Sequence, residues 1–121
     1  MTFKVIVAGS RNFDDYELLK NKLNHLLKNK ESVEIVSGTA RGADKLGERY
    51  ANETNNKLKL FPADWDRYGK SAGYIRNKQM AIYADAAIIF WDGESKGTKH
   101  MIDLANNQKI EVRIINYNRT S

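Results

Sequence analysis

Glycine stands next to a hydroxyl residue at three places where a strand-like run gives way to a helical pattern, and two of these places also hold an arginine. The segment SGTARGAD (37–44) follows one such run and holds Gly38 and Gly42 around Arg41. The segments GSR (9–11) and GT (97–98) stand at two further junctions. Glycine lets the backbone approach a ligand closely, and the start of a helix offers unpaired N–H groups with a partial positive charge. Together these residues are typical of a site that binds a phosphate group.

Basic side chains flank the same junctions. Arg11 and Arg41 lie at or just before predicted helix starts, where a cation meets the positive end of the helix dipole and costs roughly 0.3–1 kcal/mol near the surface. A bound anion would reverse the sign of that interaction. Lys96 and Lys99 flank the last helix start, but a long side chain that bends into water avoids the cost, and we favour this interpretation for both lysines. We favour it less for Arg41, whose two neighbours are small.

Other polar residues carry weaker signals. Asp44 is a candidate for the ligand site, although a residue in this position more often just satisfies the amides of the first helical turn. Glu48, one turn later, is predicted to be exposed, and Asp92 and Glu94 form a carboxylate pair whose spacing predicts nothing by itself. The sequence contains neither a Gly-x-Gly-x-x-Gly nor a P-loop pattern, and no metal-ligand spacing. It therefore predicts no cofactor and no metal.

The elements that must position these residues alternate along the chain. Apolar runs predict strands, and apolar residues at helical spacing predict helices between them. The predicted strands are 3–9, 33–38, 57–61, 86–92 and 110–117, and the predicted helices are 14–29, 41–55, 72–84 and 98–107. Asp14 or Asp15 is the expected N-cap of the first helix and Thr98 of the last. The remaining long segment, 62–71, is predicted to be irregular.

This βαβαβαβαβ order predicts an α/β fold, a Rossmann-like three-layer sandwich with a five-stranded parallel sheet. Right-handed crossovers bring the carboxyl ends of all strands to one edge. Ligands of such sheets bind at that edge, where the strand order reverses. The glycine-bearing segments described above all follow strands, so we expect them to meet there.

Length and charge agree with this assignment. A chain of 121 residues is long enough for a single domain spanning 1–121 and too short for two. The formal net charge of +5 is consistent with an anionic partner. No apolar stretch reaches the length needed to span a bilayer, so no membrane partner is expected. The absence of cysteine fits a reducing cytoplasm.

Four ordered blocks resemble one known family. They are VIVAGSRNF, IVSGTARGAD, FPADWDRYGKSAGYIRNKQM and FWDGESKGTKHMIDLA, and they extend from about Phe3 to Ala105. Together they resemble the YspA-type, cpYpsA-related branch of the SLOG superfamily. The resemblance implies a Rossmann-like fold, a nucleotide or nucleotide-derived ligand, and self-association into a homo-oligomer. It also implies a phage, prophage or bacterial conflict system, hence the cytoplasm of a bacterium or of a phage-infected host cell.

The resemblance and the junction residues together assign a ligand-binding set. Its members share a loop after a strand or the start of a helix: Gly9, Ser10, Arg11, Ser37, Gly38, Thr39, Arg41, Gly42, Asp44, Arg76, Asn77, Asp92, Gly97 and Thr98. In the LOG phosphoribohydrolases, relatives implied by the resemblance, an arginine that Arg76 resembles acts together with a glutamate. The position of that glutamate is occupied here by Met101, which cannot stabilise positive charge or activate water.

Three functions remain as hypotheses at this point. We favour a binding module that holds a phosphate-bearing nucleotide derivative, as a sensor or sequestering protein. The alternative is a hydrolase that cleaves an N-glycosidic bond, with Arg76 and one carboxylate from Asp44, Asp92 or Glu94. The third is single-stranded nucleic-acid binding, indicated by the net charge and by aromatics such as Tyr68 and Tyr74.

Overall fold

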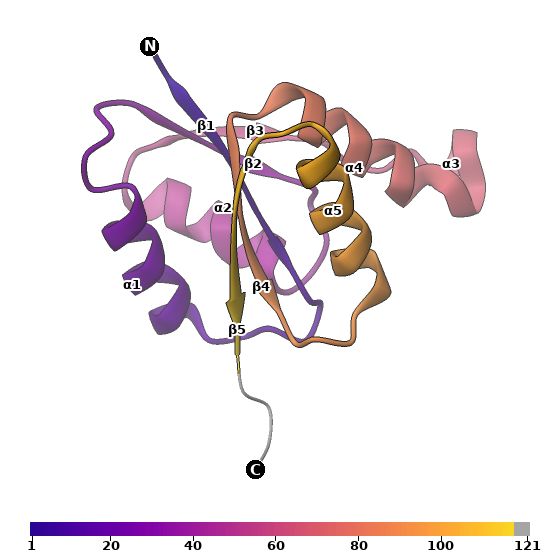
Figure 1. Cartoon of the computed structure of the whole chain (residues 1–121), viewed down its shortest axis with the longest axis horizontal. Coiled ribbons are helices and arrows are strands. Elements are labelled where there is room, and N and C mark those ends of the chain that lie inside the picture. Colours follow the sequence, from indigo (N-terminus) through magenta and orange to yellow (C-terminus); the bar gives the residue numbers. More distant parts are fainter. Residues whose placement is uncertain (118–121) are drawn as a thin grey trace.

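A computed structural model describes residues 1–117 and shows a single sheet between two layers of helices (Figure 1). The elements are β1 (Phe3–Gly9), α1 (Tyr16–Leu26), β2 (Val33–Ser37), α2 (Ala43–Glu53), β3 (Lys57–Leu60), α3 (Trp65–Tyr68), a 3-10 turn (Gly69–Ser71), α4 (Ala72–Tyr83), β4 (Ala86–Trp91), α5 (Lys96–Asn107) and β5 (Glu111–Asn116). The five strands are all parallel, in the order β3-β2-β1-β4-β5. The predicted α/β class and the five-stranded parallel sheet are confirmed.

The central strands are mostly apolar because helices cover both faces of the sheet; the charged exceptions, Lys4 of β1 and Glu34 of β2, stand second in their strands. In β1, Val5 and Val7 pack with α1 and α2, whereas Ile6 and Ala8 pack with α4 and α5. Successive side chains of a strand point to opposite faces, so one continuous apolar strand serves both cores. The edge strand β3 has only one neighbour and is mostly exposed.

The strand order reverses between β1 and β4. From β1 the chain moves outward to β2 and β3 on one side, and it then returns to β4 and continues to β5 on the other. The loops that leave β1 and β4 therefore diverge to opposite faces of the sheet and leave a crevice at its carboxyl edge. The α2 and α5 N-termini and the helix α4 border this crevice.

The last helix begins earlier than the sequence predicted. Helix α5 starts at Lys96, and its N-cap is Ser95, whose side-chain Oγ accepts a hydrogen bond from the Thr98 backbone N–H at 3.3 Å. The predicted cap, Thr98, is wrong and lies inside the first turn. Two hydroxyl residues three positions apart are both chemically suitable caps. The turn around Asp92 decides between them, because its Oδ1 accepts the Ser95 N–H at 2.9 Å.

The segment 62–71 is irregular only over residues 62–64, and the rest is helical. Asp64 caps α3 by accepting a hydrogen bond from the Arg67 N–H at 3.1 Å, and the 3-10 turn leads directly into α4. Helix α1 is shorter than predicted, and Asp15 is its cap rather than Asp14. Within residues 1–117, no helix has the length and apolar character of a bilayer span.

Gly42 fixes how the loop after β2 meets the loop after β1. Its φ is +84°, a conformation that favours glycine. A Cβ at this position would lie 2.5 Å from the Ser10 carbonyl oxygen and 2.7 Å from the Arg11 Cα. The two loops can therefore pack backbone against backbone only because residue 42 has no side chain.

A pair of substitutions compares this contact with a glycine that has open space around it. Gly93 has the same φ of +84°, but among residues 1–117 no atom lies within 4 Å of an added Cβ, so Gly93→Ala should cost only a backbone term of about 1–2 kcal/mol. Gly42→Ala should cost a further 1–3 kcal/mol or so, because the methyl group meets backbone atoms and because the ψ of −131° at this position suits glycine alone. Urea unfolding of both variants measures the difference. If Gly42→Ala and Gly93→Ala lost the same free energy of unfolding, the close packing of the two loops at Gly42 would not contribute to stability.

Candidate ligand-binding site

A cavity of about 430 Å³ opens at the carboxyl edge of the sheet, in the crevice between β1 and β4. It is lined by Ala8, Gly9, Ser10, Arg11, Asn12, Ala40, Arg41, Asp44, Arg76, Asn77, Met80, Asp92, Ser95, Gly97, Thr98 and Met101. Most of the predicted ligand-binding set is thus brought to one place. Four members of the set are not among the lining residues: Ser37, Gly38, Thr39 and Gly42.

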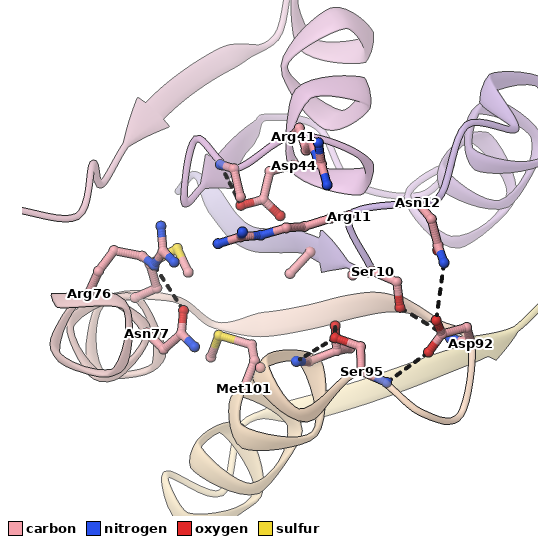
Figure 2. A pocket seen from close by; sticks show the side chains of 16 residues that line it. Ser10, Arg11, Asn12, Arg41, Asp44, Arg76, Asn77, Asp92, Ser95 and Met101 are labelled. Carbon is pink, nitrogen blue, oxygen red and sulfur yellow. Dashed lines mark hydrogen bonds between the residues drawn. The ribbon is translucent and has the colours of Figure 1, made fainter. Parts of the chain in front are cut away.

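Three arginines from three different elements border the cavity. Arg11 follows β1, Arg41 precedes α2 and Arg76 lies in α4, and Figure 2 shows Arg11 extending toward Arg76. Within residues 1–117, none of the three has a carboxylate at ion-pair distance. Burial lowers the pKa of Arg76, and the charge of Arg11 lowers it further, while Asp44 opposes the shift. The cavity therefore has an excess of positive charge.

Arg76 is held in place by two hydrogen bonds. Its Nη1 donates to the Gly38 carbonyl oxygen, and its Nε donates to Asn77 Oδ1 at 2.9 Å. A Cβ at Gly38 would lie 2.9 Å from Arg76 Nη1 and 2.9 Å from Asp44 Oδ2. Gly38 therefore leaves room for the guanidinium and the carboxylate to approach the same loop, although it does not itself line the cavity.

Asp44 is a buried carboxyl at the cavity wall, only 5% exposed. Its Oδ2 accepts a hydrogen bond from the Ala40 N–H at 3.2 Å, so it satisfies a loop amide before the helix rather than an amide of the first turn. Burial raises its pKa to about 6, against the opposing effects of the Ala40 hydrogen bond and the charge of Arg76.

The loop around Thr39 is fixed from behind the cavity. Ser37 is fully buried, and its Oγ donates to Glu48 Oε2 at 2.7 Å while accepting from the Thr39 N–H at 3.1 Å. This bond holds Thr39 at a φ of +66°. The Thr39 amide is therefore already occupied and is not free for a ligand, although Thr39 belongs to the predicted ligand-binding set. Glu48 is also not an exposed residue as predicted, since only 16% of its side chain is accessible.

Asp92 organises the loop after β4. Its Oδ1 accepts the Glu94 and Ser95 N–H groups at 2.9 Å each, and its Oδ2 accepts from Asn12 Nδ2 at 3.4 Å. The hydrogen bond from the Glu94 amide is the main reason that the pKa of Asp92 is lowered. Asn12 and Ser95 line the cavity but were not predicted. Both lie within the two loops that the strand order brings together, which is the signal that could have found them.

The family model described as the YspA, cpYpsA-related SLOG family matches residues 3–68. The chain belongs to this family. The Gene 61 protein of Mycobacterium phage D29 is 34% identical over 121 aligned residues, which cover 94% of this chain and 95% of the phage protein.

Two further relatives of this SLOG chain are larger than it is. The cholesterol galactosyltransferase of Borreliella burgdorferi is 29% identical over 91 residues, covering 75% of this chain but 24% of that protein. The solved structure of DNA processing protein A (DprA) from Streptococcus pneumoniae matches with a TM-score of 0.78 and 20% identity, covering 99% of this chain and 52% of that one. At that identity the structural match shows the shared fold.

The apolar wall of the SLOG cavity includes the position where the resemblance places a glutamate. Met101 is 2% exposed and lines the cavity, as does Met80 from α4. Asp103 is exposed and pairs with Lys99 at 2.9 Å, away from the cavity lining. Glu94 is exposed and also outside that lining. Among the carboxylates considered from sequence, Asp44 and Asp92 line the cavity.

Asn77 lines the cavity from α4 and lies next to His100 of α5, which is not among the lining residues. Asn77 is buried, and its Nδ2 lies 3.4 Å from His100 Nδ1. The His100 ring meets Tyr74 edge-on with ring centroids 4.4 Å apart, and burial lowers the pKa of His100. Trp91 packs against the core, and its Nε1 donates to the Ser95 carbonyl oxygen at 3.1 Å.

The burial of Asp44 predicts a pH-dependent stability. Its pKa rises from 3.8 to about 6 on folding, so the folded chain binds more protons between these values and loses stability as the pH rises through that window. Above pH 7 the ionised carboxylate should cost about 1–3 kcal/mol. Asp44→Asn removes the charge, and we expect a more stable protein at pH 8 and a much smaller difference at pH 4.

Urea unfolding at both pH values checks this expectation. Asp103→Asn is the control, because that carboxylate is exposed and its loss should change stability by less than about 1 kcal/mol. If Asp44→Asn were destabilising at pH 8, the carboxylate would be stabilised by its surroundings and the argument from burial would be wrong.

Proposed function

We propose that this SLOG chain binds a phosphate-bearing nucleotide or nucleotide derivative in the cavity at the carboxyl edge of its sheet. The observation that carries the proposal is the convergence of Arg11, Arg41 and Arg76 on one cavity with no carboxylate at ion-pair distance within residues 1–117. Guanidinium groups match the geometry of phosphate oxygens and bind them in pairs of hydrogen bonds. A phosphate would supply the negative charge that these side chains lack.

The start of helix α5 supports the same proposal. Gly97 and Thr98, both in its first turn, line the cavity, and the N-terminus of a helix favours an anion. The volume of about 430 Å³ is near the lower end of the roughly 300–1,000 Å³ typical of small-molecule sites. It is suited to a mononucleotide rather than to a dinucleotide.

The phage relative supports the biological setting of the proposal. The Gene 61 protein of Mycobacterium phage D29 aligns along nearly all of this chain. We place the protein as a nucleotide sensor or sequestering protein in phage or bacterial conflict, acting in the cytoplasm of the cell. Mass spectrometry of small molecules released from the purified, denatured protein would identify the ligand, and sedimentation of the native sample would test the expected homo-oligomer.

Charge removal in the cavity should weaken binding. We expect Arg11→Gln and Arg76→Gln each to weaken mononucleotide affinity at least tenfold, because hydrogen bonds to charged groups contribute about 1.5–3 kcal/mol. Arg113→Gln is the matched control, since Arg113 is exposed on β5 and outside the cavity lining. Calorimetric titration with the four ribonucleoside monophosphates measures the affinities. The proposal fails if no nucleotide binds, or if the control loses as much affinity as the cavity variants.

A second candidate is single-stranded nucleic-acid binding. Trp65, Tyr68 and Tyr74 are all exposed on α3 and the start of α4, and aromatic side chains stack on unpaired bases. The structural similarity to a DNA-processing protein also favours this candidate. It predicts oligonucleotide affinity that falls steeply with salt and is weakened by Trp65→Ala. Fluorescence anisotropy with a labelled oligonucleotide at two salt concentrations decides, and an affinity insensitive to salt would exclude it.

A further inference from the structure

We propose that Asp44 selects, among phosphate-bearing ligands, those that also carry a sugar hydroxyl group, with its Oδ1 as the acceptor. This inference rests on the proposed function, because it assumes that an anion occupies the arginine side of the same cavity. The inference specifies the class of ligand. Ribonucleotides and related sugar phosphates bind more tightly than inorganic phosphate and than nucleotides without ribose hydroxyl groups.

The two oxygens of Asp44 have different surroundings. Oδ2 accepts the Ala40 N–H at 3.2 Å, whereas Oδ1 has no hydrogen bond within residues 1–117, although the residue is only 5% exposed. Figure 2 shows this second oxygen on the side of Arg11, facing the space between the loops. The carboxyl therefore has one oxygen committed to the fold and one aimed into the cavity.

Within residues 1–117, no protein group donates a hydrogen bond to Asp44 Oδ1. Arg11 and Arg76 influence Asp44 through their charge, but neither comes within ion-pair distance of it. Arg76 donates instead to the Gly38 carbonyl oxygen and to Asn77 Oδ1. Within residues 1–117 no side-chain oxygen or nitrogen is both fully buried and without a hydrogen bond, so Oδ1 is open to the cavity. An ionised carboxylate oxygen needs a donor, and here the donor comes from whatever occupies the cavity, water or a ligand.

The chemistry of the ligand follows from this arrangement. An ionised carboxylate only accepts hydrogen bonds, and it repels a phosphate that approaches without a donor. A ligand that carries a hydroxyl group close to its phosphate satisfies both sides of the cavity at once. Its phosphate binds the guanidinium groups, and its hydroxyl group donates to Asp44. Ribose next to a 5′-phosphate has this combination, whereas a 2′,3′-dideoxyribose does not.

The test compares matched nucleotides. For each of the four bases, the dissociation constants of the ribonucleoside monophosphate and its 2′,3′-dideoxy counterpart are measured by calorimetry at pH 8. The base and the phosphate are the same in both, so the ratio isolates the hydroxyl groups. A hydrogen bond to a charged acceptor predicts that the wild-type protein prefers the ribonucleotide by about 10- to 100-fold.

Variants of Asp44 assign that preference to its side chain. Asp44→Ala should bring the ratio close to one, and Asp44→Asn should lower it at least fivefold, because the neutral amide makes a weaker bond. Asp103→Asn, exposed and outside the cavity lining, should keep the wild-type ratio. If Asp44→Ala does not fold, as judged by its thermal transition, Asp44→Asn alone decides, since its amide can still accept the Ala40 N–H.

Two results would overturn the inference while the proposed function stands. One is equal affinity of the wild-type protein for both members of every pair, and the other is an unchanged ratio in the folded Asp44 variants. Failure of the wild-type protein to bind any of these nucleotides would instead overturn the proposed function, and the inference with it.

Discussion

The contact between Arg76 and the Gly38 carbonyl joins two parts of the chain that the fold brings together from opposite faces of the sheet. Gly38 follows β2, whose crossover helices lie on one face, and Arg76 belongs to α4 on the other. The contact needs a position without a side chain, because a Cβ at Gly38 would come within 2.9 Å of the guanidinium. It directs a partly desolvated cation toward the cavity, and the excess positive charge of the site depends on it.

The site is built at a cost to the fold. A core that serves only to stabilise the fold avoids a buried carboxyl group with a raised pKa, such as that of Asp44. It also avoids a partly buried arginine such as Arg76, which has no carboxylate at ion-pair distance within residues 1–117. Perturbed groups of this kind concentrate at functional sites, although structural networks produce them too. Here the perturbed groups, Asp44 and Arg76, line one cavity at the reversal of strand order. Because both perturbed groups lie in the same cavity, we favour ligand binding over a purely structural role as the explanation for their pKa shifts.

The sequence predicted the architecture well because the signals for it are local. Runs such as 5–8 and 86–91 are apolar without alternation, which indicates strands covered on both faces. The meeting of the glycine-bearing loops then followed from topology alone. The sequence predicted the details less well where two residues of similar chemistry compete, as Ser95 and Thr98 do for the cap of α5.

Burial of polar groups was the main property that could not be predicted. The partner of Glu48 is the Ser37 hydroxyl at the end of β2, and only the three-dimensional packing of α2 against that strand shows it. The same holds for the two oxygens of Asp44, since a sequence does not say which atom of a carboxylate is already bonded. Thr39 shows the limit most clearly, because a glycine-rich loop suggests free amides and its own N–H is occupied by Ser37.

The two methionines that face the cavity from different helices have a consequence for the range of ligands. Met80 and Met101 are unbranched and polarisable, and such side chains change conformation at little cost to follow the outline of a flat apolar group. A rigid wall of branched residues would fit one heterocycle and reject others. The wall formed by the two thioether side chains is adaptable, so we expect purine and pyrimidine bases to be accepted alike. The arginines and the Asp44 carboxylate should instead be selective for the polar half of the ligand, its phosphate and sugar.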